Sequence, residues 1–188
     1  MQDGGFGHLV QKVVGKMARL KLYEYPHPVL KQKCVAVKKE EFNAELKQLL
    51  EDMQETMYLE AGVGLAAPQV GISRRIVVID VERDENGAKP GNPLQMVNPE
   101  IVWRSDEIVC GQEGCLSVPG QHADVERYAE VKVAYYTPEG EKIELLADGL
   151  LAIAVQHELD HLDGILYIDR ISRLKRQMLI KKLNKSKK

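Results

Sequence analysis

The segment from Gly149 to Asp163 constrains the fold more than any other part of the chain, because it is an apolar, helix-forming stretch that carries two histidines. His157 and His161 are four residues apart, which in an α-helix is a rotation of about 40° and a rise of about 6 Å. Both imidazoles can therefore reach one metal ion from the same helix face. Gly164 ends the pattern, as glycine commonly does after a helix C-terminus.

Glu158 adds a carboxylate to the apolar side of this helix. It is rotated about 100° from His157, and a helical wheel surrounds it with Leu151, Ala154 and Leu162. A carboxylate without a partner is costly there, but beside a metal-bound water it gains a partner and can transfer protons. The alternative is that His157 and His161 are surface histidines and that Glu158 forms a salt bridge. It is disfavoured because, on the helical wheel, all three lie away from the arc of polar residues. That arc, which we expect to face solvent, contains Gln156, Asp160 and Asp163.

Two histidines leave ligand positions open, and the pattern His-Glu-x-x-His indicates a hydrolase without specifying which one. Besides the carboxylates, the candidate ligands are Cys34, Cys110, Cys115, His8, His27 and His122. We expect Cys34 and Cys110 to be small buried apolar side chains, the usual role of an isolated cysteine. An odd number of cysteines, three in this chain, argues against a disulfide framework and favours a reducing, cytoplasmic setting.

The other segments predict an α+β fold in which antiparallel sheets pack around the central metal-binding helix. A helix in the N-terminal half is expected from Phe42 to Met57, where apolar residues recur at steps of three and four, with Asn43 as its cap. Four segments have the composition of strands, namely Arg75–Val81, Leu94–Trp103, Val125–Tyr136 and Lys142–Leu146. The turn Thr137–Gly140 joins the last two into an antiparallel hairpin. Two further segments are expected to be a loop, Glu82–Pro93, and a C-terminal helix, from about Ser172 to Lys182.

Charge divides the chain of 188 residues into an acidic body and a basic tail. The segment from Arg170 to Lys188 has nine basic and no acidic residues, whereas residues 1–169 hold the other 17 of the 26 basic residues and all 28 acidic ones. This polarity suggests a polyanionic partner for the tail. We interpret residues 1–188 as one catalytic domain, with residues 1–18 as a loose extension and 170–188 as a basic helix and tail. No run approaches the ~20 apolar residues of a membrane helix, and we expect neither a membrane nor a DNA partner.

Three motifs together resemble the peptide deformylase family, which removes the formyl group from new bacterial polypeptides. The motifs are Gly62-Val63-Gly64-Leu65-Ala66-Ala67-Pro68-Gln69, Glu113-Gly114-Cys115-Leu116-Ser117 and Gln156-His157-Glu158-Leu159-Asp160-His161. They stand in the family's order and match its pattern position by position, within a resemblance that covers roughly Leu20 to Met178. The resemblance implies a metallohydrolase that releases formate from the N-terminal formyl-methionine of newly synthesised polypeptides.

The resemblance implies that Cys115, His157 and His161 bind one divalent metal ion, with water in the fourth position. Such a site is open and therefore suited to catalysis. The metal-bound water would attack the formyl carbon, with Glu158 as general base and then general acid. Cys-His-His ligation by itself favours zinc, whereas the resemblance implies Fe(II) in the cell, with Zn, Ni or Co able to replace it.

The resemblance also implies the substrate contacts. Gln69 and the backbone N–H of Leu116 would hydrogen-bond the formyl oxygen, and the peptide would lie along Gly62, Val63 and Gly64. One departure is His122, which stands seven residues after Cys115, where many relatives have arginine. A guanidinium contact to the substrate is therefore not expected there. His122 as a fourth ligand is disfavoured, because a closed site would lose its water.

Two hypotheses concern residues outside the reaction itself. Glu113 stands two residues before Cys115, and Arg127 follows in the next extended segment, so we expect them to pair and to hold the loop that carries Cys115. The alternative is two independent surface charges. The basic tail is expected to dock on ribosomal RNA near emerging chains, because it carries nine positive charges and the family's substrate is the nascent peptide. The alternative for the tail is a solvated segment without a partner.

Two other functions compete with a deformylase. A zinc peptidase shares His-Glu-x-x-His, but many such enzymes place their third ligand downstream of the motif. After His161 this chain has no His, Cys or Glu, and only Asp163 and Asp169 remain. A non-catalytic RNA- or ribosome-binding module would be driven by the tail. The presence of Gln69 together with Cys115 and the His-Glu-x-x-His pattern argues against lost catalysis.

Overall fold

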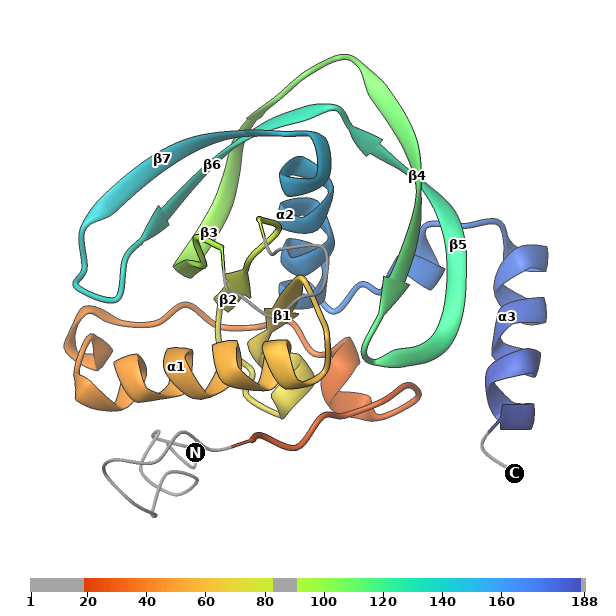
Figure 1. Ribbon diagram of the computed structural model, residues 1–188, viewed down its shortest axis with the longest axis horizontal. Coiled ribbons are helices and arrows are strands. Elements are labelled where there is room, and N and C mark those ends of the chain that lie inside the picture. The colour runs from red at the N-terminus through yellow and green to blue at the C-terminus, as the bar shows by residue number, and fades with distance from the viewer. Residues whose placement is uncertain (1–18, 83–90, 187–188) are drawn as a thin grey trace.

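The computed structural model describes residues 19–82 and 91–186. Helix α2 (Gly149–Leu162) stands in the middle of the molecule, and the strands curve around it (Figure 1). In the described part, two antiparallel sheets and three α-helices form a mixed architecture, which confirms the predicted α+β class. The expected N-terminal extension and most of the expected loop Glu82–Pro93 lie outside the described residues.

The larger sheet has five strands in the order β1-β2-β3-β6-β7, with every neighbouring pair antiparallel. Their bounds are Gly64–Ala66 (β1), Ile76–Ile79 (β2), Leu94–Arg104 (β3), Glu130–Tyr136 (β6) and Lys142–Asp148 (β7). Strand β2 is apolar along its whole length because both of its faces are covered. Val77 and Ile79 belong to the core around α2, and Ile76 and Val78 to the core under the N-terminal helix. The hairpin of β6 and β7 confirms the prediction from the turn between them.

The second sheet is a hairpin of β4 (Ile108–Cys115) and β5 (Val118–Tyr128). The prediction of one extended segment over Val125–Tyr136 was wrong, because the chain changes sheets at Ala129, whose N–H donates to the carbonyl of Glu107 at 2.9 Å. Strand β4 was not predicted, since two glycines and few apolar residues hide its pattern. Cys110 lies on this strand and is exposed, contrary to expectation, whereas Cys34 is buried as expected.

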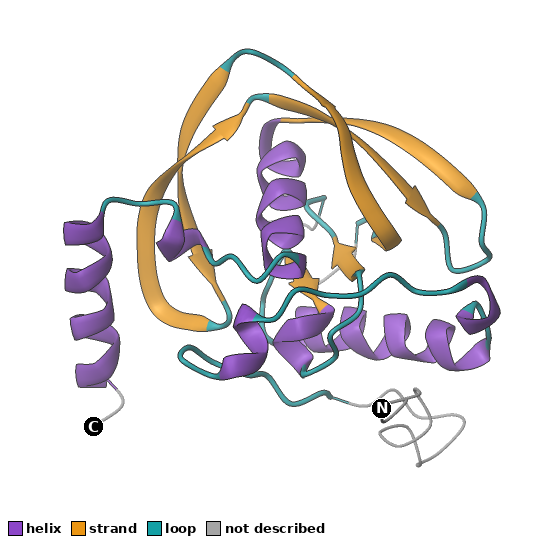
Figure 2. Cartoon of the chain, turned by 180° about the vertical axis from the view of Figure 1, so that it is seen from behind, coloured by secondary structure: helices purple, strands orange, loops and turns teal. Residues whose placement is uncertain are grey.

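The other two helices lie at the edges of the molecule. Helix α1 (Ala44–Leu59) is capped as predicted, with the Asn43 side chain accepting from the Leu46 N–H at 3.1 Å. Helix α3 (Arg173–Ser186) runs further than predicted and lies outside β5, away from α1 (Figures 1 and 2). No helix in the described ranges combines the length and the apolar character needed to cross a bilayer.

Helix α3 is held to the body by two leucines, of which Leu183 is fully buried. We predict that Leu183→Ala lowers the free energy of opening α3 by about 2–3 kcal/mol, because it removes buried methyl groups and leaves a cavity. Hydrogen exchange of the α3 amides measures this, since an edge helix can open locally. Met178→Ala is the control: Met178 is 56% exposed, so its change should stay within about 0.5 kcal/mol. Equal effects of the two variants would contradict this packing.

Candidate active site

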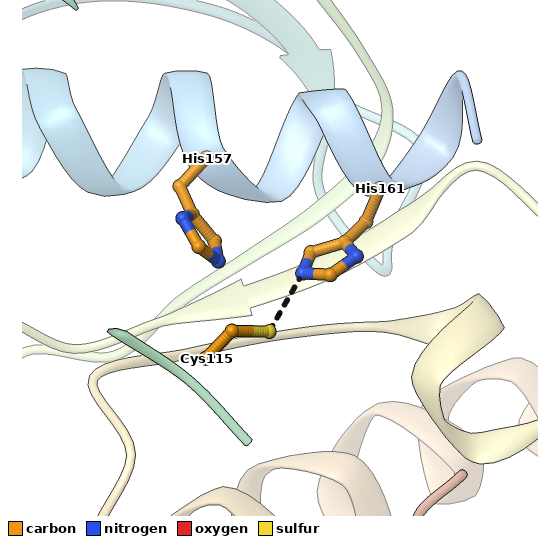
Figure 3. Close-up of side chains that lie close together, drawn as sticks. All are labelled: Cys115, His157 and His161. Atoms are coloured by element: carbon orange, nitrogen blue, oxygen red, sulfur yellow. Dashed lines mark hydrogen bonds between the residues drawn. The ribbon is translucent and has the colours of Figure 1, made fainter. Parts of the chain in front are cut away.

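Three metal-binding side chains meet between α2 and the β4–β5 hairpin. The Sγ of Cys115 and one ring nitrogen each of His157 and His161 lie within 4.8 Å of one another. Figure 3 shows both imidazoles projecting from α2 toward Cys115, whose Sγ is 3.2 Å from Nε2 of His161. Cys115 is the last residue of β4, directly before the two-residue turn into β5. The helix spacing and the end of the hairpin thus bring one thiol and two imidazoles to one point.

This donor set fits a divalent transition metal. Thiolate and imidazole are the ligands that zinc and iron accept in proteins. The pKa of His161 lies well below its usual value, because burial disfavours the charged ring and nearby His157 adds to the effect. A neutral imidazole is the form that can bind a metal. Within the described ranges, no other group of three such side chains is close enough to do so.

Glu113 connects the hairpin to one of the histidines. Arg127 donates to its carboxylate twice, from Nε to Oε1 at 2.7 Å and from Nη2 to Oε2 at 3.0 Å. Oε2 also lies 2.7 Å from Nδ1 of His157. Burial alone would raise the pKa of Glu113, but the hydrogen bonds from Arg127 and His157 lower it to about 2. The ionised carboxylate accepts only, so Nδ1 of His157 carries a hydrogen. Although burial opposes it, hydrogen bonding to Cys115 and Glu113 raises the pKa of His157 well above its usual value, so a metal bound at Nε2 would displace a proton there.

Glu158 is buried beside the same histidines, with 5% of its surface exposed. Burial raises the pKa of Glu158 to about 7, against the opposing effect of His157. Its Oε2 has no hydrogen-bond partner among the described residues. The start of β1 approaches the carboxylate very closely, since a Cβ on Gly64 would stand 2.4 Å from Oε1. A side chain at position 64 would therefore displace the Glu158 carboxylate, a constraint that could not be read from the sequence.

The Gln69 side chain is locked by two neighbours. Its Oε1 accepts from the Ala66 N–H at 2.8 Å, and its Nε2 donates to Ser117 Oγ at 3.2 Å. Nε2 is also 3.5 Å from the sulfur of Cys115. The N–H side of the amide therefore faces the donor set. Ser117 was not singled out in the sequence, although it completes the motif around Cys115.

A cavity of about 810 Å³ opens in front of these groups. Its wall contains Cys115, His157 and Glu158, whereas His161 does not line it. The residues expected to contact substrate all border this one cavity: Gly62, Val63, Gly64, Gln69 and Leu116. His122 also lines it from the hairpin, and Leu150 and Ile153 add apolar surface from α2. The cavity is large enough for the end of a peptide.

The expected solvent-exposed face of α2 was wrong for two of its three residues. Gln156 and Asp160 are buried, whereas Asp163 is exposed. Gln156 faces β5, where its Nε2 donates to the Tyr128 carbonyl at 2.9 Å. Asp160 accepts from Nη1 of Arg127 at 2.6 Å. The helical wheel separates polar from apolar residues correctly, but it does not show that β5 supplies buried partners to the polar side.

A thiol, two imidazoles and a buried glutamate at the wall of a peptide-sized cavity define a site of the metallohydrolase type. The chain belongs to the polypeptide deformylase family, whose model matches residues 19–177, and it is therefore an enzyme of the hydrolase class. It is 47% identical over 169 residues to the peptide deformylase of Phenylobacterium zucineum, covering 90% of this chain and 97% of that protein.

Solved structures agree with this assignment. A peptide deformylase from Legionella pneumophila superposes with a TM-score of 0.83 at 41% identity, covering 90% of this chain and 96% of that one. A class I type b peptide deformylase from Acinetobacter baumannii, solved with Met-Ala-Ser bound, gives a TM-score of 0.78 at 42% identity, covering 83% and 100% of the two chains.

The contacts of Glu113 lead to a prediction about metal affinity. Glu113→Gln removes the charge that Arg127 and His157 share, and we expect metal affinity to fall about 10- to 100-fold, as for other direct partners of ligand histidines. Competition with a chelator measures it. Glu126→Gln is the matched control, because this exposed carboxylate on β5 lies opposite Cys110 rather than near the donor set. Wild-type affinity in Glu113→Gln would show that Glu113 does not orient His157.

Proposed function

We propose that this enzyme removes the N-formyl group from the formyl-methionine that begins newly made polypeptides, acting in the cytoplasm where nascent chains emerge. The observation that carries the proposal is the Cys115, His157 and His161 donor set beside the buried Glu158 at the cavity wall. Membership of the deformylase family supports the same reaction. The Met-Ala-Ser bound by the Acinetobacter baumannii relative has the form of a deformylated product.

We assign Cys115, His157 and His161 to one divalent ion, Fe(II) in the cell, with Zn, Ni or Co as replacements in a purified sample. When bound, the ion supplies a Lewis acid that lowers the pKa of water and polarises the formyl oxygen. Glu113 supports this assignment, because it fixes the tautomer of His157 that leaves Nε2 available.

The proton transfers are assigned to Glu158. Its carboxylate takes a proton from the attacking water as the oxygen joins the formyl carbon. It then delivers that proton to the amine nitrogen as the C–N bond breaks, which releases formate and a free amino terminus. A carboxyl group whose pKa is raised to about 7 can serve in both steps near neutral pH.

As the water oxygen joins the formyl carbon, negative charge develops on the formyl oxygen. Gln69 Nε2 and the Leu116 N–H would stabilise this charge by donating hydrogen bonds to that oxygen. One such preorganised donor is typically worth about 2.7–4 kcal/mol of barrier. The hydrogen bonds that fix the Gln69 amide to the Ala66 N–H and to Ser117 Oγ support this role, because the amide needs little reorientation during the reaction. The backbone of Gly62–Gly64 borders the cavity and is proposed to lie along the bound peptide.

The reaction predicts a specific loss in Glu158→Ala. Formate release from formyl-Met-Ala-Ser should fall about 10²–10⁴-fold, while anaerobically prepared protein keeps its metal. A coupled formate assay and metal analysis of the same sample measure both. Glu126→Ala, at an exposed carboxylate, should retain wild-type release. A folded, metal-loaded wild type that releases no formate would overturn the proposal, and cleavage of an internal peptide bond instead would favour a peptidase.

We also propose that the basic segment from Arg170 to Lys188 binds ribosomal RNA. Its helix α3 stands at the edge of the molecule beyond β5, as Figure 2 shows, and three of its lysines are exposed near its end: Lys181, Lys182 and Lys185. Lysines that contact phosphates release counterions, so binding should weaken steeply with added salt.

The triple change of Lys181, Lys182 and Lys185 to Gln tests this partner. We expect weaker ribosome binding and a salt dependence reduced by about one unit of slope for each lost phosphate contact. Sedimentation with ribosomes over a series of salt concentrations gives both numbers. The matched control changes Lys38, Lys39 and Lys142, which are exposed on the body, to Gln. Equal binding by the two triple variants would remove the tail from ribosome recognition.

A further inference from the structure

Asp160 lies between two arginines that belong to different parts of the molecule. Arg127 comes from β5, and its Nη1 donates to Oδ2 of Asp160 at 2.6 Å. Arg170 begins the basic C-terminal segment, and its Nε donates to the same Oδ2 at 2.6 Å while its Nη2 bonds Oδ1. Asp160 is 7% exposed and Arg127 only 4%, whereas the side chain of Arg170 is 43% exposed. The group therefore reaches from the surface into the core.

These contacts continue inward to the donor set. All three guanidinium nitrogens of Arg127 donate hydrogen bonds: Nη1 donates to Asp160, and Nε and Nη2 donate to Glu113. The guanidinium is therefore fixed between two carboxylates. Glu113 in turn accepts from Nδ1 of His157. Each link is a charge-assisted hydrogen bond with little solvent around it, and such bonds are strong and directional. Two arginines and two carboxylates balance one another in charge.

We propose that Arg170 is a positioning residue for the metal site, acting on His157 through Asp160, Arg127 and Glu113. The inference rests on the metal site of the proposed function. Without Arg170, each oxygen of the Asp160 carboxylate would lose one donor, and only Nη1 of Arg127 would still donate to Oδ2. The carboxylate could then rotate toward water or draw Arg127 away from Glu113, and the hydrogen bond that orients His157 would become less well defined.

Cobalt-loaded protein tests the proposal by readouts other than activity. We expect Arg170→Gln to release Co(II) to a chelator about three- to tenfold faster, less than the 10- to 100-fold typical of a direct partner of a ligand histidine. The visible absorption of the cobalt site should broaden or shift in the same variant. Arg170→Lys should be intermediate, because lysine keeps the charge but cannot hold both oxygens of Asp160 in a fork.

The matched control is Arg104→Gln. Arg104 and Arg170 line the same groove of about 930 Å³ on the side of α2 away from the active site, but Arg104 lies over the Tyr128 ring, 4.4 Å from its centroid. Cobalt release and absorption of Arg104→Gln should match wild type. A double variant, Asp160→Asn with Arg170→Gln, should release metal no faster than Asp160→Asn alone, because the two residues act in series.

The outcomes separate this inference from the proposed function. Equal cobalt release and equal spectra for Arg170→Gln, Arg170→Lys and Arg104→Gln would overturn the role of Arg170 and leave the deformylase proposal intact. A wild type that holds no cobalt through its cysteine would overturn both. Thermal unfolding of each metal-free variant is measured alongside. If Arg104→Gln also released cobalt faster, and the release rate of each variant followed its loss of thermal stability, a positioning role for Arg170 would be contradicted.

Discussion

The buried carboxylate of Glu113 is the interaction on which the site depends. It joins β4 to β5 through Arg127 and joins both to α2 through His157. Without this carboxylate, the guanidinium and the imidazole would face each other in a region closed to water, where unpaired charge is costly. The same residue thus supports the hairpin, the central helix and the orientation of a metal ligand.

Helix α2 combines an apolar surface with five buried polar side chains, those of Gln156, His157, Glu158, Asp160 and His161. Gln156, His157 and Asp160 each have hydrogen-bond partners on neighbouring elements. Oε2 of Glu158 and Nδ1 of His161 have no hydrogen-bond partner among the described residues, and burial also raises the pKa of Glu158. A protein tolerates such a group where the group has chemistry to perform, and the position of Glu158 beside the donor set is consistent with that reason.

The sequence pattern predicted the helices and most of the larger sheet well, because their apolar periodicities are strong. It also predicted that His157 and His161 share a face, which follows from helix geometry alone. Strand β4 and the change of sheets at Ala129 were missed, since hairpin partners and sheet changes depend on contacts far apart in the chain. Asp160 was placed in solvent for the same reason: a helical wheel contains no information about β5.

The positions of Cys115 and His157 have a mechanical consequence. Cys115 lies next to the turn of a hairpin and His157 lies inside a helix from a different part of the chain, so an ion bound to both would act as a cross-link between them. Because the three ligands come together only in the folded chain, the binding free energy of the ion would add to the stability of the fold. The metal would then hold the hairpin against the helix as well as take part in the reaction, in addition to the link that Glu113 makes between them.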